Sequence, residues 1–175
     1  MAENRGLIHV YCGDGKGKTT AAVGLAVRAA GRNFRVTMVQ FLKSTDTGEL
    51  NSLKKIGGIR LIRSQEALGF TFRMNEEQKR HAAAVQQQLW EQALAAVESS
   101  NLLILDEVMA ALSSGMISES QVLDFLNKKP EDLEVVLTGR NPPKAVLERA
   151  DYISEIKKIR HPFDSGIPAR EGIEK

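Results

Sequence analysis

The stretch of sequence that decides the fold is Gly13-Asp14-Gly15-Lys16-Gly17-Lys18-Thr19-Thr20. An apolar run, residues 7–12, comes before it, and a helical pattern, residues 21–30, follows it. Small residues let backbone N–H groups approach an anion closely, and the following helix points its positive end at the same place. Strand, glycine-rich turn and helix together predict a phosphate-binding P-loop.

Two side chains of this loop carry the predicted chemistry. Lys18 supplies a cation for the phosphates, and the Thr19 hydroxyl can bind Mg²⁺ or Mn²⁺. The strict pattern G-x-x-x-x-G-K-[ST] requires glycine at position 12, where this sequence has Cys12. The loop is therefore a variant of the pattern. The alternative is a tight strand-to-helix turn that is rich in glycine and lysine by chance.

The composition limits the class of protein. At 175 residues the chain is most simply one domain, residues 1–175, with an adequate core. The net charge of +2 gives no indication of nucleic-acid or membrane binding. The single cysteine excludes an intrachain disulfide and points to a reducing compartment. The first residues do not read as a signal peptide and no apolar run approaches about 18 residues, so we expect a cytoplasmic protein.

A second motif fits the P-loop. The run Leu102-Leu103-Ile104-Leu105 is apolar and ends in Asp106-Glu107. An acid at the end of a central strand beside a P-loop can hold Mg²⁺, and Glu107 could accept a proton or join the metal shell. The alternative is that both acids cap the helix that begins at Val108. We expect the metal ligands to be Thr19, Asp106 and Glu107.

Strands and helices are expected to alternate along the rest of the chain. Further strands are predicted at residues 35–42, 59–63, 134–140 and 151–159, and further helices at residues 50–56, 75–99, 108–112, 118–128 and 143–150. Buried strands that alternate with helices predict an α/β fold with a mostly parallel sheet and helices on both faces. Together with the P-loop, this predicts a P-loop NTPase-like (RecA-like) domain.

Several polar residues follow these strands at the edge where such folds bind ligands. Arg140 ends the strand 134–140, and an arginine there suits phosphate or carboxylate. Lys43 and Glu49 follow the strand 35–42, and Arg28 lies two and a half turns beyond Thr19; solvation explains these three about as well as ligand contact. The expected nucleotide-binding residues are Gly13, Asp14, Gly15, Lys16, Gly17, Lys18, Thr19, Thr20, Arg28 and Arg140.

Two other segments leave alternatives open. Phe70 and Phe72 stand one residue apart before the long helix; phenylalanine pairs usually fill cores, and the residues alone favour that reading. The tail, residues 160–170, contains too much proline for a regular element. It could be disordered, fold over the site or lie across a dimer contact.

Taken together, the motifs resemble one family. They are Gly13-Asp14-Gly15-Lys16-Gly17-Lys18-Thr19-Thr20-Ala21-Ala22, Val39-Gln40-Phe41-Leu42-Lys43, Gly69-Phe70-Thr71-Phe72, Leu105-Asp106-Glu107, Thr138-Gly139-Arg140 and His161-Pro162-Phe163-Asp164-Ser165-Gly166. The chain looks like an ATP:corrinoid adenosyltransferase from near residue 7 to its end. In that family the phosphate loop also departs from the strict pattern at the position of Cys12.

The resemblance implies a reaction. The cobalt(I) of a corrinoid, either cobalamin or cobyrinic acid a,c-diamide, attacks C5′ of ATP, and triphosphate leaves, in adenosylcobalamin biosynthesis and salvage. The P-loop of the family holds ATP in the reverse sense to an ordinary NTPase. The resemblance also implies a homodimer, an electron-donating flavoprotein partner, and a role for Phe70 and Phe72 in displacing the lower axial ligand of cobalt. The second aromatic is commonly Trp in the family, and the tail end Gly172-Ile173-Glu174-Lys175 also departs from it.

The expected catalytic residues are accordingly Lys18, Glu107, Phe70 and Phe72. Cobalt(I) carries no proton, so this reaction needs no general base, and the sequence offers no Ser-His-Asp or Cys-His set. Two other functions stay open: an ordinary P-loop ATPase or kinase, in which Glu107 would orient a water, and a nucleotide-dependent regulatory binder without turnover. The product made from ATP distinguishes the three.

Overall fold

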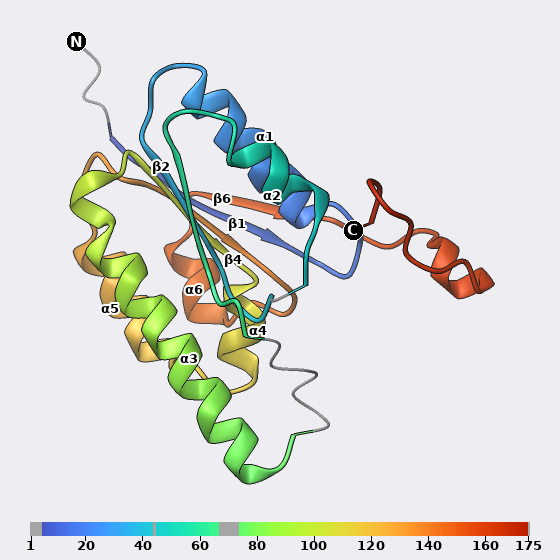
Figure 1. Ribbon diagram of the computed structural model, residues 1–175. Helices are drawn as coiled ribbons and strands as arrows, with labels where there is room; N and C mark the ends of the chain where they lie inside the picture. Colours follow the sequence, from blue (N-terminus) through green and yellow to red (C-terminus); the bar gives the residue numbers. More distant parts are fainter. Residues whose placement is uncertain (1–4, 44, 67–73, 175) are drawn as a thin grey trace.

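A six-stranded parallel sheet forms the centre of the computed structural model, which describes residues 5–43, 45–66 and 74–174 (Figure 1). The strands are β1 (Ile8–Cys12), β2 (Val36–Gln40), β3 (Ile59–Arg63), β4 (Leu102–Asp106), β5 (Glu134–Thr138) and β6 (Tyr152–Glu155). Their order in the sheet is β3-β2-β4-β5-β1-β6, and neighbouring strands run parallel. Because the strands are parallel, all of their carboxyl ends meet at one edge.

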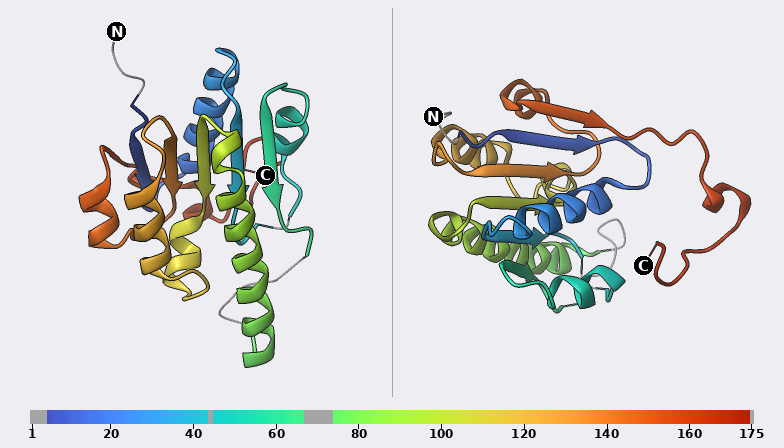
Figure 2. Two further views of the ribbon diagram at one scale, coloured as in Figure 1. Left: turned by 90° about the vertical axis from the view of Figure 1, so that its left-hand side faces the viewer. Right: turned by 90° about the horizontal axis from the view of Figure 1, so that it is seen from above.

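Helices cover both faces of this sheet, as the sequence predicts (Figure 2). One face packs against α1 (Lys18–Ala30) and α2 (Gly48–Leu53). The other face packs against α3 (Glu76–Ala95), α4 (Val108–Ser113), α5 (Glu119–Lys128) and α6 (Lys144–Arg149). Within the described ranges no helix is both long and apolar enough to cross a membrane.

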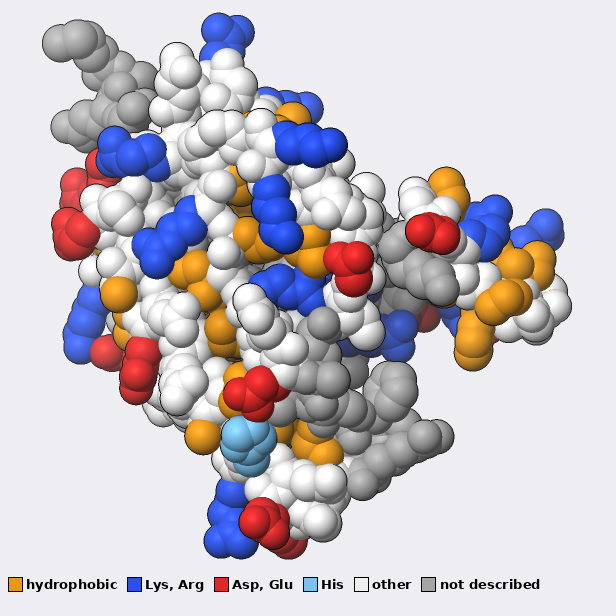
Figure 3. Space-filling view, viewed as in Figure 1, with side chains coloured by type: hydrophobic (Ala, Val, Ile, Leu, Met, Phe, Trp, Pro, Cys, Tyr) orange, Lys and Arg blue, Asp and Glu red, His pale blue; other side chains and the backbone are white. Residues whose placement is uncertain are grey.

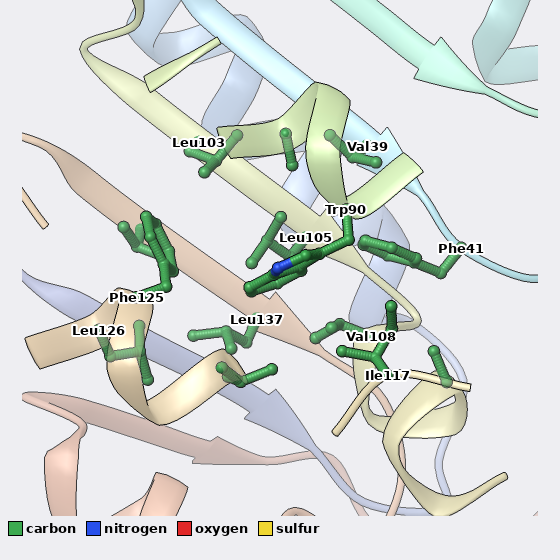
Figure 4. Close-up of a cluster of buried hydrophobic side chains, with 14 of the residues drawn as sticks. Val39, Phe41, Trp90, Leu103, Leu105, Val108, Ile117, Phe125, Leu126 and Leu137 are labelled. Atoms are coloured by element: carbon green, nitrogen blue, oxygen red, sulfur yellow. The ribbon is translucent and has the colours of Figure 1, made fainter. Parts of the chain in front are cut away.

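The core on the α3 side is built around Trp90 (Figure 4). This indole is 3% exposed and meets the ring of Phe125 edge-to-face, with ring centroids 5.8 Å apart. Leu105 of β4 and Leu137 of β5 are fully buried in the same cluster. Aromatic and aliphatic side chains of this size dominate the burial that stabilises a domain. Trp90 is therefore a core residue, as its place on the long predicted helix indicates.

On the opposite face, small side chains bring α1 close to the sheet. Ala22 and Ala26 of α1 are fully buried against Met38 and Ile104. Alanine has a strong helix propensity and little bulk, so this helix is stable and also lies close to the strands. The close packing fixes the amino end of α1, and with it the phosphate loop, relative to the sheet.

Several element boundaries differ from those that the sequence predicts. α1 begins at Lys18 rather than at residue 21, so the last part of the loop is already helical. β4 ends at Asp106, one residue early, and β6 ends at Glu155 rather than at residue 159. The helix predicted at residues 118–128 is observed as α5, which Ser118 caps with a reciprocal capping box to Gln121.

Candidate nucleotide-binding site

The phosphate loop connects β1 to α1 at the carboxyl edge of the sheet. Gly13 has φ 102° and Gly17 has φ 122°, values at which a side chain is strained. A Cβ on Gly13 would lie 2.4 Å from the carbonyl oxygen of Ile156, and one on Gly15 would lie 2.7 Å from the same oxygen. The glycines are thus required by backbone conformation and by the close approach of the segment that follows β6.

Three hydrogen bonds tie the loop to that segment. The backbone N–H of Ile156 donates to the carbonyl of Cys12 (2.9 Å), and the N–H of Gly15 donates to the carbonyl of Ile156 (2.8 Å). The N–H of Lys158 donates to a carboxylate oxygen of Asp14 (2.9 Å), and this bond lowers the pKa of Asp14. The Asp14 side chain therefore braces the loop, and its contact with nucleotide stays a prediction.

Lys18 folds back over the loop. Its ammonium donates to the carbonyl of Gly15 at 2.8 Å, and the residue is 8% exposed. Burial lowers the pKa of Lys18, the positive charge of Arg140 lowers it further, and the negative charge of Glu107 opposes both. The lysine is held beside the loop in the position from which it can meet a phosphate.

Asp106, the last residue of β4, is fully buried and accepts hydrogen bonds from several elements. Its Oδ1 accepts from the hydroxyls of Thr19 (2.9 Å) and Thr138 (2.7 Å). β5 lies between β1 and β4 in the sheet, so Thr138, the last residue of β5, lies between the end of β1, where the phosphate loop begins, and Asp106. The helix-capping alternative for Asp106 is wrong, because its carboxylate faces the phosphate loop rather than the start of α4.

Glu107 occupies a left-handed conformation, with φ 60° and ψ 20°. Its backbone N–H donates to the hydroxyl of Thr138 at 2.9 Å. Its side chain makes no capping bond to α4, so the capping alternative fails here as well. The residue instead lines the pocket above the loop, where its negative charge opposes the lowering of the Lys18 pKa by burial.

An open pocket of about 1050 Å³ lies above the loop. Its walls are the phosphate loop, Glu107, Arg140, side chains on either side of the start of α2, and C-terminal residues between Lys158 and Glu174 that include the tail; the residues at α2 are Lys43, Thr45, Thr47, Gly48, Glu49 and Ser52. Its lining carries both charges. Six Lys and Arg side chains, Lys16, Lys18, Lys43, Arg140, Lys158 and Arg170, stand with five acids, Asp14, Glu49, Glu107, Asp164 and Glu174. Lys158 and Arg170 pair with two of these acids, so the basic side chains at the phosphate loop, Lys16, Lys18 and Arg140, are the ones that suit the triphosphate of a nucleotide.

The tail forms the outer wall of this pocket, which is one of the three arrangements that its sequence leaves open. It projects from the body of the molecule and carries several hydrophobic side chains (Figure 3). Phe163 is 73% exposed and Ile167 is 47% exposed. Arg170 pairs with Glu174 and lowers the pKa of that carboxyl to about 2. The tail is therefore held by local ion pairs rather than by a buried core.

Most of the expected site residues meet at this pocket. The loop residues from Asp14 to Thr20, together with Glu107 and Arg140, line it, and Thr19 reaches Asp106. Arg28 does not: it is exposed in the last turn of α1, roughly 15 Å along the helix from Lys18. Its contact with nucleotide stays a prediction that this geometry does not favour. Phe70 and Phe72 lie outside the described residues.

The donor atoms at Asp106 suit a magnesium ion. A hydroxyl from Thr19 and a carboxylate are hard oxygen ligands of the type that Mg²⁺ prefers. In the described part of the chain no cluster of three or more His, Cys, Asp or Glu side chains could hold a metal alone. Phosphate oxygens and water would have to complete the shell, which is usual for Mg²⁺. Beside Asp106, the side-chain oxygen of Gln40 is buried and has no hydrogen-bond partner among the described residues. This oxygen could accept a hydrogen bond from a water molecule bound to the metal.

Sequence reasoning missed two residues of this centre. Gln40 donates to Asp106 Oδ2 at 3.3 Å, and Thr138 bridges Asp106 and Glu107. Each is a polar residue in a buried strand that reaches the ligand edge, and that signal was available in the sequence. The order of the strands in the sheet, which brings both residues to Asp106, could not be read from the sequence.

Fold and site together define a P-loop protein of the NTPase fold class. A solved structure with this fold is the flagellar accessory protein FlaH from Methanocaldococcus jannaschii. It matches with a TM-score of 0.55 at 16% identity, over 86% of this chain and 71% of that one. At this identity the likeness shows the fold alone.

The sequence relatives narrow the class to a family. The family model ATP:corrinoid adenosyltransferase BtuR/CobO/CobP matches residues 4–174. A corrinoid adenosyltransferase of Escherichia coli (strain K12) is 36% identical over 98% of this chain and 87% of that protein. Corrinoid adenosyltransferase CobA of Salmonella typhimurium (strain LT2) is 35% identical over the same shares. The chain belongs to the ATP:corrinoid adenosyltransferase family, as the motifs predict.

Proposed function

We propose that this chain, acting as one domain over residues 1–175, transfers the 5′-deoxyadenosyl group of ATP to the cobalt(I) of a corrinoid. The reaction releases triphosphate and serves adenosylcobalamin biosynthesis and salvage. The observation that carries the proposal is an open pocket of about 1050 Å³ in which Lys16, Lys18 and Arg140 line the P-loop of a chain that belongs to this family.

The chemistry needs charge stabilisation rather than proton transfer. The electron pair of cobalt(I) forms the bond to C5′, and the pair of the C5′–O bond leaves with the triphosphate. Lys18, the backbone N–H groups of the loop and Arg140 are disposed to stabilise the charge that grows on the leaving oxygen. Glu107 supports this role, because its charge opposes the lowering of the Lys18 pKa by burial.

The proposed metal ligands are Thr19, Asp106 and Glu107, with Mg²⁺ or Mn²⁺ as the ion. When bound, the ion supplies additional positive charge to the triphosphate. Two observations support a metal ion here. Thr19 and Asp106 offer oxygen ligands, and beside them the side-chain oxygen of Gln40 is buried without a hydrogen-bond partner among the described residues. Thr138 holds the Asp106 carboxylate in one orientation, so the ligand is pre-positioned.

The corrinoid side of the reaction is proposed from the family resemblance. Phe70 and Phe72 would crowd the lower face of the corrinoid, an electron-donating flavoprotein would supply cobalt(I), and the enzyme would act in the cytoplasm as a homodimer. Arg63, which ends β3 shortly before these aromatics, lies at the same edge of the sheet as the pocket. The exposed apolar side chains of the tail, such as Phe163, support a contact with a second copy.

The test is incubation of the protein with ATP and chemically reduced corrinoid. We expect the visible spectrum of a cobalt–carbon product and the release of inorganic triphosphate in equal amounts. The control omits corrinoid: ADP and phosphate in that sample would identify an ordinary ATPase. Bound nucleotide that is returned intact in both samples would identify a regulatory binder.

A further inference from the structure

Lys43 lies where the proposed metal ion would bind. Its ammonium is 2.7 Å from Asp106 Oδ2 and 2.9 Å from the hydroxyl oxygen of Thr19, and it donates to both. The Asp106 side chain is 0% exposed, whereas the Lys43 side chain is 24% exposed. The proposed function above assigns no role to this lysine.

We propose that Lys43 is the resident counter-ion of Asp106 in the nucleotide-free enzyme, and that it exchanges with the metal ion in each catalytic cycle. Metal arrival with ATP displaces the ammonium, and departure of the metal with triphosphate lets it return. The inference rests on the proposed metal site at Thr19 and Asp106. Its test measures metal binding and stability rather than adenosyl transfer, so the two ideas can fail separately.

Asp106 is a buried carboxylate whose negative charge must be balanced. A carboxylate without water and without a cation is strongly destabilising, and removal of one partner of a buried pair is costly. Thr19, Thr138 and Gln40 donate to Asp106, but all three are neutral. In the described part of the chain Lys43 is the cation in contact with Asp106. Until a metal ion arrives, this lysine balances the charge.

The Lys43 ammonium and a metal ion at Asp106 would exclude each other. Oδ1 of Asp106 accepts from two neutral hydroxyls, whereas Oδ2 accepts from the Gln40 amide and from Lys43, so departure of Lys43 would leave Oδ2 and the Thr19 oxygen as the atoms open to a metal. Both of these atoms accept from the ammonium of Lys43. Mg²⁺ binds oxygen at about 2.0–2.1 Å, so it would compete for the same lone pairs and repel the ammonium.

The side chain of Lys43 can move while the backbone just before it is held. The N–H of Leu42 donates to the buried amide oxygen of Gln86 at 2.9 Å, which fixes the chain just before the lysine. The lysine side chain has a flexible four-carbon stem and lines the open pocket. Once displaced, its charge remains beside the proposed triphosphate position.

The experiment measures binding of Mn²⁺ alone to the nucleotide-free protein, using the electron paramagnetic resonance signal of free Mn²⁺. Lys43→Met keeps the length of the side chain and removes the charge; Lys43→Arg keeps the charge; Lys55→Met changes an exposed lysine away from the site. We expect the apparent Kd for Mn²⁺ to fall at least about tenfold in Lys43→Met, because the site no longer has to release its own cation. Lys43→Arg and Lys55→Met should bind Mn²⁺ as weakly as the wild type.

Thermal denaturation provides the second readout. Lys43→Met should melt roughly 5 °C or more below wild type without ligand, because Asp106 has lost its cation. Saturating Mg²⁺, compared with NaCl of equal ionic strength, should close most of that gap. Adding Asp106→Asn to Lys43→Met should also restore the melting temperature. This double variant shows whether an unpaired carboxylate is the cause even if Lys43→Met alone folds poorly.

An equal Mn²⁺ affinity for wild type and Lys43→Met would overturn the exchange. If that variant also binds ATP more weakly in the presence of a chelator, Lys43 is a phosphate ligand only. If the Mn²⁺ difference is found but no adenosyl transfer occurs with reduced corrinoid, the exchange stands and the proposed function fails.

Discussion

Replacing Thr138 with valine tests how the acidic centre is built. The Thr138 hydroxyl donates to Asp106 Oδ1 at 2.7 Å and accepts from the backbone N–H of Glu107 at 2.9 Å. Threonine 138 is fully buried. Valine has nearly the same shape, so Thr138→Val removes both hydrogen bonds and opens little cavity.

The expected cost follows from these two bonds. A buried hydrogen bond to a charged group contributes about 1.5–3 kcal/mol, and a buried N–H left without a partner costs about 1–3 kcal/mol. The Glu107 N–H is only partly buried, so its loss falls at the lower end of that range. We expect Thr138→Val to lower the free energy of unfolding by roughly 2.5–4 kcal/mol and the melting temperature by roughly 5–15 °C.

The assay is equilibrium denaturation in urea, with Thr138→Ser as the matched control. Serine keeps the hydroxyl and loses one methyl group, so it should retain most of the stability. Turnover with ATP and reduced corrinoid should fall in Thr138→Val even at temperatures where the protein is folded, because Asp106 and Glu107 lose their shared anchor. The reasoning is refuted if Thr138→Val unfolds within about 0.5 kcal/mol of wild type, or if serine is as damaging as valine.

Three further predictions address the proposed site. Lys18→Ala should leave the fold intact and weaken ATP binding by about 1.5–3 kcal/mol or more, measured by calorimetry; near-normal turnover at limiting ATP would contradict the P-loop assignment. Glu107→Gln should lower the rate by an amount that depends on Mg²⁺ concentration, and a deficit indifferent to Mg²⁺ would remove this acid from the metal site. Phe70→Ala and Phe72→Ala should melt close to wild type and lose activity most when the assay starts from cobalt(II) corrinoid with a reductase. A large fall in melting temperature with equal loss from cobalt(I) and cobalt(II) would assign both rings to the core.

The phosphate loop could be located from sequence because its signals are local. The strand before Gly13, the spacing of the glycines and the pair Lys18-Thr19 all fall within a short window. Each element depends mainly on its own residues, so the alternation of strands and helices was predictable as well. The exact ends were not, because α1 begins as soon as the loop closes at Gly17.

The partners of Asp106 could not be predicted because they come from distant parts of the chain. Thr138 is a neighbour of Asp106 because β5 pairs with β4, a fact that no short window contains. Lys43 was an ambiguous loop residue until β2 was placed beside β4. The tail was equally undetermined, since a proline-rich sequence without a helical or strand period does not specify what it lies against.

The attachment of the phosphate loop to residues 156–158 also has a consequence for how the protein is made. β1 and the loop leave the ribosome before β5 and β6, but β1 lies between these two strands in the sheet, and Asp14 accepts from the N–H of Lys158. Such contacts between segments far apart in the sequence form late, after the intervening residues are available. A nascent chain therefore carries the complete phosphate-loop sequence through most of its synthesis without the surroundings that shape it. The phosphate loop is thus translated well before the strand and the segment that complete the nucleotide site around it.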